Sequence, residues 1–372
     1  MLEQTRHRRA QKRDINHPIQ FLRQGLALTA KAILTQRSLR ISCLCAVAVW
    51  SAWLTINGPG HALANLRDHW EVTITMVFGS MVAGGTSMGG GAVAFPVLTK
   101  WLQVPPYEAK VFSLAIQSVG MGAASLTILA MGTEVEWRFI RWVGLGGIPG
   151  IVFGSVFLAP ILPPETIKIS FTMMLSSFAI LLFALNRTRR GRNLAIPTWK
   201  RRERVFSLGV GLVGGIISGL VGSGLDIFSF SVMVLLFGLC EKVSTPTSVI
   251  LMAINAWTGF ILHQYFIGDF VEPVRNYWLA AVPAVVVGAP TGAMLCSLLK
   301  RQTIAKILIG LILVELVSSL ILIPLNSTLI SSSVGIFVLF SSMYYWMYQT
   351  KVYVPKGDSR LTNNPLKGAA AK

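Results

Sequence analysis

The sequence predicts an all-α polytopic membrane protein, and three observations favour this class. First, 53% of the 372 residues are hydrophobic and only 13% are charged, whereas a soluble domain carries roughly 25% charged residues. Second, apolar stretches near the length needed to cross ~30 Å of hydrocarbon recur along the chain. Third, the basic residues cluster at 6–40, 187–204 and 351–372, beside the apolar stretches.

The net charge of +18 also fits a nucleic-acid-binding protein. However, the basic clusters are not interleaved with aromatic residues as in single-strand-binding proteins. The positive-inside rule explains them as cytoplasmic loops and tails, with some attraction to anionic lipid headgroups. We therefore expect a multi-pass protein of the cell inner membrane with cytoplasmic termini, membrane lipid as a partner and no nucleic-acid partner.

Eight uninterrupted apolar segments are expected to span the membrane. The first long apolar run begins only near Ile41, after a basic segment, which is too late for a cleaved signal peptide and favours a retained anchor helix. The predicted spans are residues 41–57, 110–132, 140–160, 166–186, 245–265, 277–298, 304–324 and 329–349.

Two further apolar stretches, 73–99 and 206–237, are each interrupted near the middle by small residues. The first interruption runs from Gly84 to Gly91, and the second is Gly222-Ser223-Gly224. Because glycine costs a helix about 1 kcal/mol relative to alanine, such tracts predict a helix break.

Charge counting predicts that neither interrupted stretch crosses the membrane. If both crossed, 21 Lys and Arg residues would lie inside and 12 outside. If both enter and turn back as re-entrant hairpins, 28 lie inside and 5 outside. The positive-inside rule favours the hairpins.

The hairpins give the chain two units of inverted topology, each a hairpin followed by three spans. Aligning Gly91 with Gly224 also aligns Gly89 with Gly222. Inverted repeats with broken helices near the midplane are typical of secondary transporters. The predicted organisation is a basic segment 1–40, an extra helix 41–57, a first repeat 73–186, a basic linker 187–205, a second repeat 206–324, an extra helix 329–349 and a tail 350–372.

The two breaks are the predicted binding site. A helix that restarts after a break has N–H groups without intrahelical partners and the positive end of its dipole, which together suit an anion. The alternative is that the glycines serve close helix packing and that the amides only join helices. The candidate substrate-binding residues are Thr86, Ser87, Gly89, Gly90, Gly91, Gln117, Gly222, Ser223, Gly224, Thr245, Thr247, Ser248 and Asn255.

Two acidic residues inside the apolar stretches are candidates for coupling transport to H+ or Na+. Glu315 lies near the middle of its span, where an acid costs ~2.5–3.5 kcal/mol on insertion scales. It would carry a coupling proton or bond to a neighbouring helix. Asp226 lies three residues after Ser223, the spacing of a helix cap, and would cap the restarted helix or hold a cation.

No enzyme is indicated. The sequence has no HExxH pair, no nucleophile elbow and no GxxxxGK[ST] loop, and its four cysteines have no metal-ligand spacing with histidine. We expect no catalytic residues, no metal and no cofactor. An uncoupled anion channel and a membrane scaffold remain alternatives to a transporter, and the sequence does not give the oligomeric state.

Two motifs resemble those of the TauE/SafE family, also called the 4-toluene sulfonate uptake permease family. The stretch Thr86–Pro96 is similar to its Gly-rich first motif, and Gly222–Asp226 with Glu241–Ser248 to its second-half motif. The resemblance covers about residues 72–325 and leaves the first and last helices as additions. It implies a secondary transporter of a small anion, such as sulfite, a sulfonate or another organosulfur anion, working by alternating access.

Overall fold

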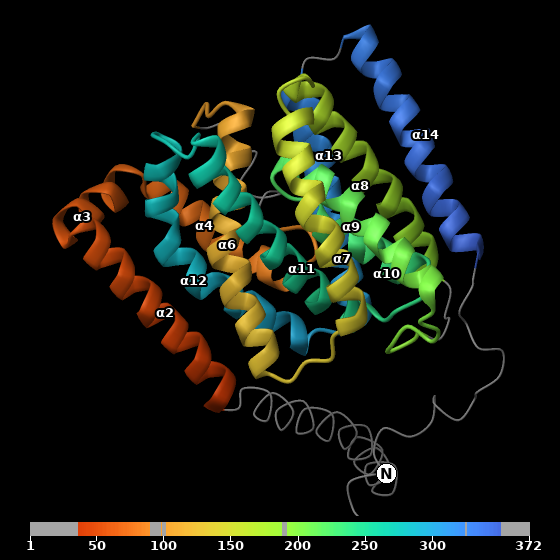
Figure 1. Ribbon diagram of the computed structural model, residues 1–372, viewed down its shortest axis with the longest axis horizontal. Coiled ribbons are helices and arrows are strands. Elements are labelled where there is room, and N and C mark those ends of the chain that lie inside the picture. Colours follow the sequence, from red (N-terminus) through yellow and green to blue (C-terminus); the bar gives the residue numbers. More distant parts are fainter. Residues whose placement is uncertain (1–35, 90–97, 99–101, 188–191, 324–325, 351–372) are drawn as a thin grey trace, which may run out of the picture.

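The computed structural model describes residues 36–89, 98, 102–187, 192–323 and 326–350 (Figure 1). These residues form helices and connecting loops, with one isolated bridge between Asn193 and Leu239. Nine of the described helices are long and apolar enough to cross a membrane. The predicted all-helical membrane fold is therefore confirmed. Gly90, Gly91 and the basic segment before residue 36 lie outside the described residues, as does the tail after residue 350.

Eight of these nine helices follow the predicted spans closely, and the ninth, Arg201–Val221, overlaps the stretch 206–237 that was expected to be a re-entrant hairpin. The segments predicted at 110–132 and 166–186, for example, are Pro106–Ala130 and Pro164–Arg187. The helices are α2 Gln36–Asn57, α3 Pro59–Asp68, α4 Trp70–Gly85, α6 Pro106–Ala130, α7 Trp137–Phe153, α8 Pro164–Arg187, α9 Arg201–Val221, α10 Leu225–Leu235, α11 Glu241–Ile261, α12 Val274–Leu298, α13 Arg301–Leu322 and α14 Ser327–Thr350. Short π-helical segments extend α7 through Gly154–Leu158 and α11 through Leu262–Ile267.

Helix α3 is not among the predicted elements. Proline at its start suits the first turn of a helix. Its 10 residues are too few to cross a membrane, and their apolar residues are too few to stand out from a loop.

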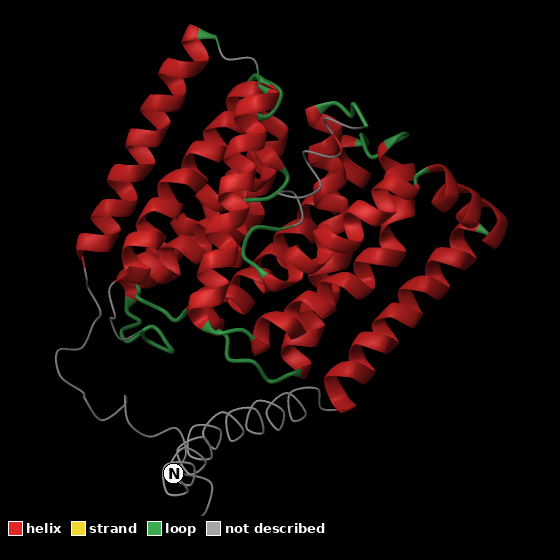
Figure 2. Ribbon diagram, turned by 180° about the vertical axis from the view of Figure 1, so that it is seen from behind, coloured by secondary structure: helices red, strands yellow, loops and turns green. Residues whose placement is uncertain are grey.

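Both predicted interruptions occur in the structure. Helix α4 ends at Gly85, and α9 ends at Val221, where Gly222 takes a left-handed conformation with φ 90°. Helix α10 starts after Gly224. We call residues 86–89 the first break and residues 222–224 the second break. Figure 2 shows loop segments inside the helical body, away from the loops at its two ends.

One end of the helical body is defined by residues 192–200, and we call it the linker face. Three loops meet there. The backbone N–H of Ile196 donates to Glu136 Oε2 at 2.9 Å, and that of Asn193 donates to the Gly238 carbonyl at 2.9 Å. Arg301 forms an ion pair with Glu241 at 3.4 Å. The loops before α7, before α11 and before α13 therefore all lie at the linker face.

The opposite end is the far face. The Tyr107 hydroxyl at the start of α6 donates to Asp269, which precedes α12. Asn65 of α3 donates to the Asn276 carbonyl at 2.8 Å. Helices α4, α6 and α12 therefore begin at the far face, whereas α7, α9, α11 and α13 begin at the linker face.

Two parallel helix pairs join the halves of the chain: α4 packs on α12, and α9 packs on α7. Glycines bring both pairs into backbone contact. A Cβ atom at Gly292 would lie 2.0 Å from the Met81 carbonyl oxygen, and one at Gly211 would lie 2.1 Å from the Val143 carbonyl oxygen. Close packing is thus the role of these glycines, as it is for Gly84, which is still helical and lies against Ala289.

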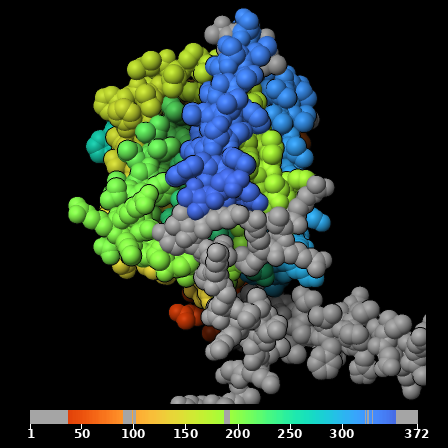
Figure 3. Space-filling model, turned by 90° about the vertical axis from the view of Figure 1, so that its right-hand side faces the viewer, coloured from red at the N-terminus to blue at the C-terminus, as the bar shows by residue number. Residues whose placement is uncertain are grey.

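The terminal helices lie on opposite flanks of this body. Helix α2 packs against α6 and α12, whereas α14 packs mainly against α8. Figure 3 shows α14, in blue, lying along one flank of the molecule. The breaks are therefore enclosed by the helices between α4 and α13.

Candidate functional site

Each break is bonded to a helix from the other half of the chain. In the first break, the Ser87 and Ser248 hydroxyl oxygens are 2.9 Å apart, which joins the break to α11. In the second break, the Gly222 carbonyl accepts hydrogen bonds from Ser113 Oγ at 3.1 Å and Gln117 Nε2 at 3.0 Å, which join it to α6. The structure thus brings Ser87, Gln117, Gly222 and Ser248 of the candidate set into one buried polar centre.

The orientation of Gln117 is fixed by its neighbours. Its Nε2 donates to the Ser113 carbonyl at 3.0 Å and the Ser113 hydroxyl at 2.7 Å, in addition to Gly222. An amide nitrogen is a donor only, so these acceptors place Oε1 on the other side. Gln117 Oε1 has no hydrogen-bond partner in the described part of the chain.

Gly89, with φ 63°, brings the two breaks together. A Cβ atom at Gly89 would lie 2.8 Å from Gln117 Oε1 and 3.1 Å from Asp226 Oδ2. Asp226 is 1% exposed, and its Oδ2 also has no hydrogen-bond partner in the region described. Two buried acceptor oxygens therefore face the same glycine, an arrangement that suits a proton or a cation.

The other oxygen of Asp226 caps α10. Asp226 Oδ1 accepts from the backbone N–H groups of Gly224 at 3.2 Å and Ile227 at 2.9 Å. The N–H of Leu225 donates to the Ser218 hydroxyl at 2.9 Å. The sequence predicts that N–H groups at the start of this helix are open to an anion. Those of Gly224, Leu225 and Ile227 are instead hydrogen-bonded within the protein. Ser223 lies beside them and is 4% exposed.

Other buried polar atoms lie along α11. Thr245 Oγ1 and both polar atoms of Asn255 lack a hydrogen-bond partner within the described ranges. Gly147 lies against Asn255, because a Cβ atom there would be 3.3 Å from Asn255 Oδ1. Thr247 differs from these residues, because its hydroxyl bonds the Val243 carbonyl at 2.6 Å and the Glu136 N–H at 3.1 Å. Thr247 therefore serves the loop before α7.

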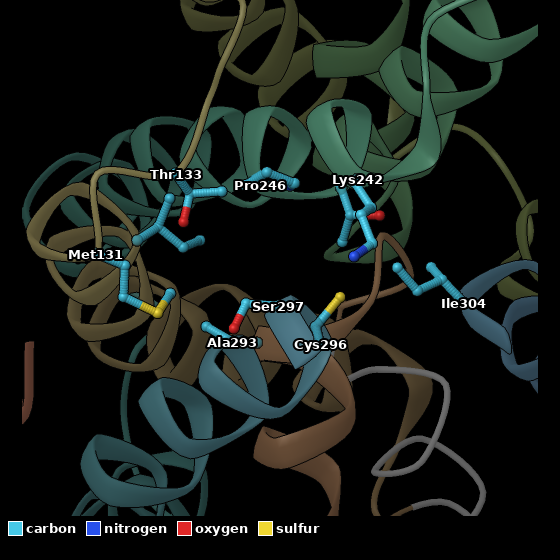
Figure 4. A pocket seen from close by; sticks show the side chains of 11 residues that line it. Met131, Thr133, Lys242, Pro246, Ala293, Cys296, Ser297 and Ile304 are labelled. Atoms are coloured by element: carbon cyan, nitrogen blue, oxygen red, sulfur yellow. The ribbon is translucent and has the colours of Figure 1, made fainter. Parts of the chain in front are cut away.

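A cavity of about 250 Å³ lies between the linker face and the first break. Its wall includes Gly84 and Thr245, and Figure 4 shows Lys242 and Cys296 reaching into it from α11 and α12. From the sequence, Lys242 is only a charge of a loop and is not among the candidate site residues. Its place in the Glu-Lys…Thr-Pro-Thr-Ser stretch was the available signal.

Glu315 is not brought to the breaks. It forms an ion pair with Lys168 of α8, and the Ser319 hydroxyl donates to it at 3.4 Å. Thr172 and Ser319 bond at 2.9 Å in the same contact. Glu315 therefore joins α8 to α13, which is the interhelical interpretation of this residue.

Lys110 and Lys168 are counted with the outside loops in the sequence analysis. The structure places both within helices, where they are 3% and 7% exposed. Their long side chains are buried between helices instead of lying in a solvated loop. In the part of the chain described, no group of three or more His, Cys, Asp or Glu residues is arranged to hold a metal ion.

The fold and the buried centre define a polytopic helical membrane protein with broken helices at its core. The chain matches the family described as Sulfite exporter TauE/SafE over residues 72–319, from α4 to α13, and it belongs to that family. It is therefore a membrane transporter of the sulfite exporter-like class. No curated protein and no solved structure matches the chain.

Proposed function

We propose that this protein is a secondary transporter that moves a small anion, namely sulfite, a sulfonate or another organosulfur anion, across the inner membrane by alternating access. The observation that carries the proposal is the pairing of each break with the opposite half of the chain, through Ser87–Ser248 and Gln117–Gly222. Broken helices that meet between inverted repeats are a common basis of transport sites.

The connections of the breaks support two re-entrant hairpins of opposite orientation. Residues on either side of α9 and α10 are bonded to each other, because the Asn193 carbonyl accepts from the Cys240 N–H at 2.8 Å. This pair therefore leaves the linker face and returns to it. Helices α4 and α6 both begin at the far face, so the chain between them also returns to the face that it left. The swapped packing of α4 on α12 and α9 on α7 agrees with an inverted repeat.

The cavity at the linker face supports a path for an anion. Lys242 provides a positive charge at its wall, and Thr245 provides a buried hydroxyl without a hydrogen-bond partner among the described residues. Gly84 connects the cavity to the first break. In the proposed path, an anion leaves Lys242, is held by neutral hydroxyl and backbone donors at the first break, and crosses to the far face when the hairpins rearrange.

Asp226 is the proposed coupling residue. Its Oδ2 and Gln117 Oε1 are both acceptors and cannot hydrogen-bond each other while Asp226 is ionised. A proton on Asp226, or a sodium ion beside it, would satisfy one or both oxygens. A cation bound there would also offset the charge of an anion at the neighbouring first break. Glu315 is the weaker candidate, because Lys168 already offsets its charge.

The test is anion flux in liposomes that contain the purified protein. We expect saturable uptake of sulfite or methanesulfonate by the wild type, driven by a proton or sodium gradient. Gly222→Leu should abolish this uptake. A Cβ atom there would lie 2.8 Å from the Lys110 carbonyl oxygen, and Gly222 has φ 90°, which residues with a side chain rarely adopt. Gly132→Leu is the matched control, since Gly132 also has a positive φ but has open space around it.

The outcomes separate the alternatives. Flux that responds to the anion gradient but to no cation gradient would replace the transporter with a channel. Undiminished flux in a folded Gly222→Leu variant would remove the second break from the path. Absence of flux for every small anion would contradict transport itself.

A further inference from the structure

A second, smaller cavity lies at the far face. Its volume is about 40 Å³, and its wall is formed by α6, the start of α8 and the last residues of α9. Lys110 and Lys168 both line it, together with Tyr107 and Val221. It is therefore at the opposite end of the molecule from the cavity that contains Lys242.

The ammonium group of Lys110 has no acceptor for its hydrogen bonds in the described chain, although the residue is 3% exposed. Its Nζ lies 4.3 Å from the centroid of the Tyr107 ring. An ammonium has three donors, and a ring contact leaves them without acceptors. Since a buried charge is costly unless it is paired, a bound anion would stabilise the Lys110 ammonium.

The other charged groups around this cavity are already engaged. Glu315 offsets the charge of Lys168. Asp269 attracts Lys110, but its two oxygens bind the Tyr107 hydroxyl and His263 Nδ1, the latter at 2.8 Å and 2.9 Å. Lys110 therefore provides the donors that remain open in the described wall of the cavity.

The cavity lies directly behind the second break. A Cβ atom at Gly222 would be 2.8 Å from the Lys110 carbonyl oxygen, and Val221 belongs to the cavity wall. Lys110 lies in the second turn of α6, and Lys242 lies in the first turn of α11. Each lysine follows a glutamate closely, Glu108 by two residues and Glu241 by one. The two lysines thus line cavities at opposite faces.

We propose that Lys110 binds a small oxyanion in the far-face cavity and that this site is the counterpart of the Lys242 cavity at the linker face. The choice of ligand rests on the proposed function: a sulfur oxyanion or a short alkyl sulfonate. The small volume argues against bulky aromatic sulfonates. Lys110 would hold the anion beside the second break before or after it crosses the buried centre.

The experiment uses a thiol as a local reporter. The native cysteines Cys43, Cys45, Cys240 and Cys296 are replaced by serine, and Ala159→Cys, in the cavity wall, supplies the only thiol. The rate of alkylation by iodoacetamide is measured against methanesulfonate concentration. We expect methanesulfonate to slow alkylation in a saturable way. Lys110→Gln should raise the half-protecting concentration roughly tenfold, as expected for the loss of a charged hydrogen bond.

Two further variants make the result specific. Lys110→Arg keeps the charge and should keep protection, and Lys242→Gln, at the other face, should leave protection of the reporter thiol unchanged. Absence of protection with Lys110 present, or equal protection in a folded Lys110→Gln variant, would overturn the proposal. Flux is measured on the same proteins. Protection without flux would support the Lys110 site and contradict transport, whereas flux without protection would support transport and contradict the site.

Discussion

The two breaks follow helices that pack in the same way, but the breaks differ in chemistry. Each follows a helix that packs in parallel, through glycines, on a helix of the other half. The first break meets hydroxyl groups, Ser87 and Ser248, near the cavity that contains Lys242. The second carries the carboxylate of Asp226 and the carbonyl held by Gln117. In the proposed function, the first break would therefore hold the anion and the second break the cation.

The largest expected effect comes from the shared architecture. Gly211→Ala would place a Cβ atom 2.1 Å from the Val143 carbonyl oxygen and force α9 away from α7. Gly209, two residues earlier in α9, has nothing within 4 Å. We expect Gly211→Ala to lower the thermal midpoint and the yield of monodisperse protein sharply. Gly209→Ala should be neutral or slightly stabilising, since alanine favours a helix by about 1 kcal/mol. Equal behaviour of the two variants would contradict the packing described for this pair.

The next effect tests the chemistry of the second break. Asp226→Asn keeps an oxygen for the cap of α10 and gives an N–H to the unpaired Gln117 oxygen. We expect the folded variant to lose gradient-driven uptake, because the amide of Asn has no titratable proton and no charge to hold a cation, while anion exchange continues. Glu165→Gln, an exposed acid at the start of α8, is the control. Gradient-driven uptake that survives in Asp226→Asn would exclude Asp226 as the coupling residue.

A smaller effect is expected in the cavity beside the first break. Lys242→Gln should raise the concentration of anion needed for half-maximal flux by roughly tenfold, as for the loss of one charged contact. Lys306→Gln removes an exposed lysine of α13 and should have no such effect. Concentration curves for sulfite and methanesulfonate in liposomes measure this. Superimposable curves for wild type and Lys242→Gln would place the anion path elsewhere.

The smallest effect concerns acid pH at the far face. Burial raises the pKa of Asp269, but hydrogen bonds from His263 and Tyr107 outweigh it and hold the pKa below its ordinary value of 3.8. A lowered pKa stabilises the folded protein above the ordinary pKa, and this stability is lost as the pH falls through the folded-state pKa. The thermal midpoint of the wild type should therefore fall more than that of Asp269→Asn between about pH 5 and pH 3. Parallel curves would contradict a role for this carboxylate.

The sequence predicted the spans well, because length and apolar composition alone decide whether a helix suits a membrane. It also predicted the breaks, since clustered glycines lower the helix propensity of a segment. The end of α4 was less predictable. Gly84 and Gly85 remain helical because α12 packs on them, and such a contact between distant segments leaves no local signal.

The candidate site was predicted only in part for the same reason. The contacts Ser87–Ser248 and Gln117–Gly222 join residues far apart in the chain, so residue types alone gave the candidates but not their partners. Lys110 lies at the predicted end of a span, where the sequence gives it only the role of a loop charge. The fold is needed to show that its ammonium is buried beside the second break.

We propose that the two interrupted segments, residues 70–105 and residues 201–240, enter the membrane from opposite faces and that each returns to the face from which it entered. This topology is tested most directly by labelling single exposed cysteines with a membrane-impermeant maleimide in sealed spheroplasts and inverted vesicles. Arg67→Cys and Gln103→Cys lie near the two ends of the first interrupted segment. Lys200→Cys and Lys242→Cys lie near the two ends of the second. We predict that the first two label from one side of the membrane and the last two from the other. Labelling of Lys200→Cys and Lys242→Cys from opposite sides would show that the second interrupted segment crosses the membrane, and would contradict a re-entrant hairpin there.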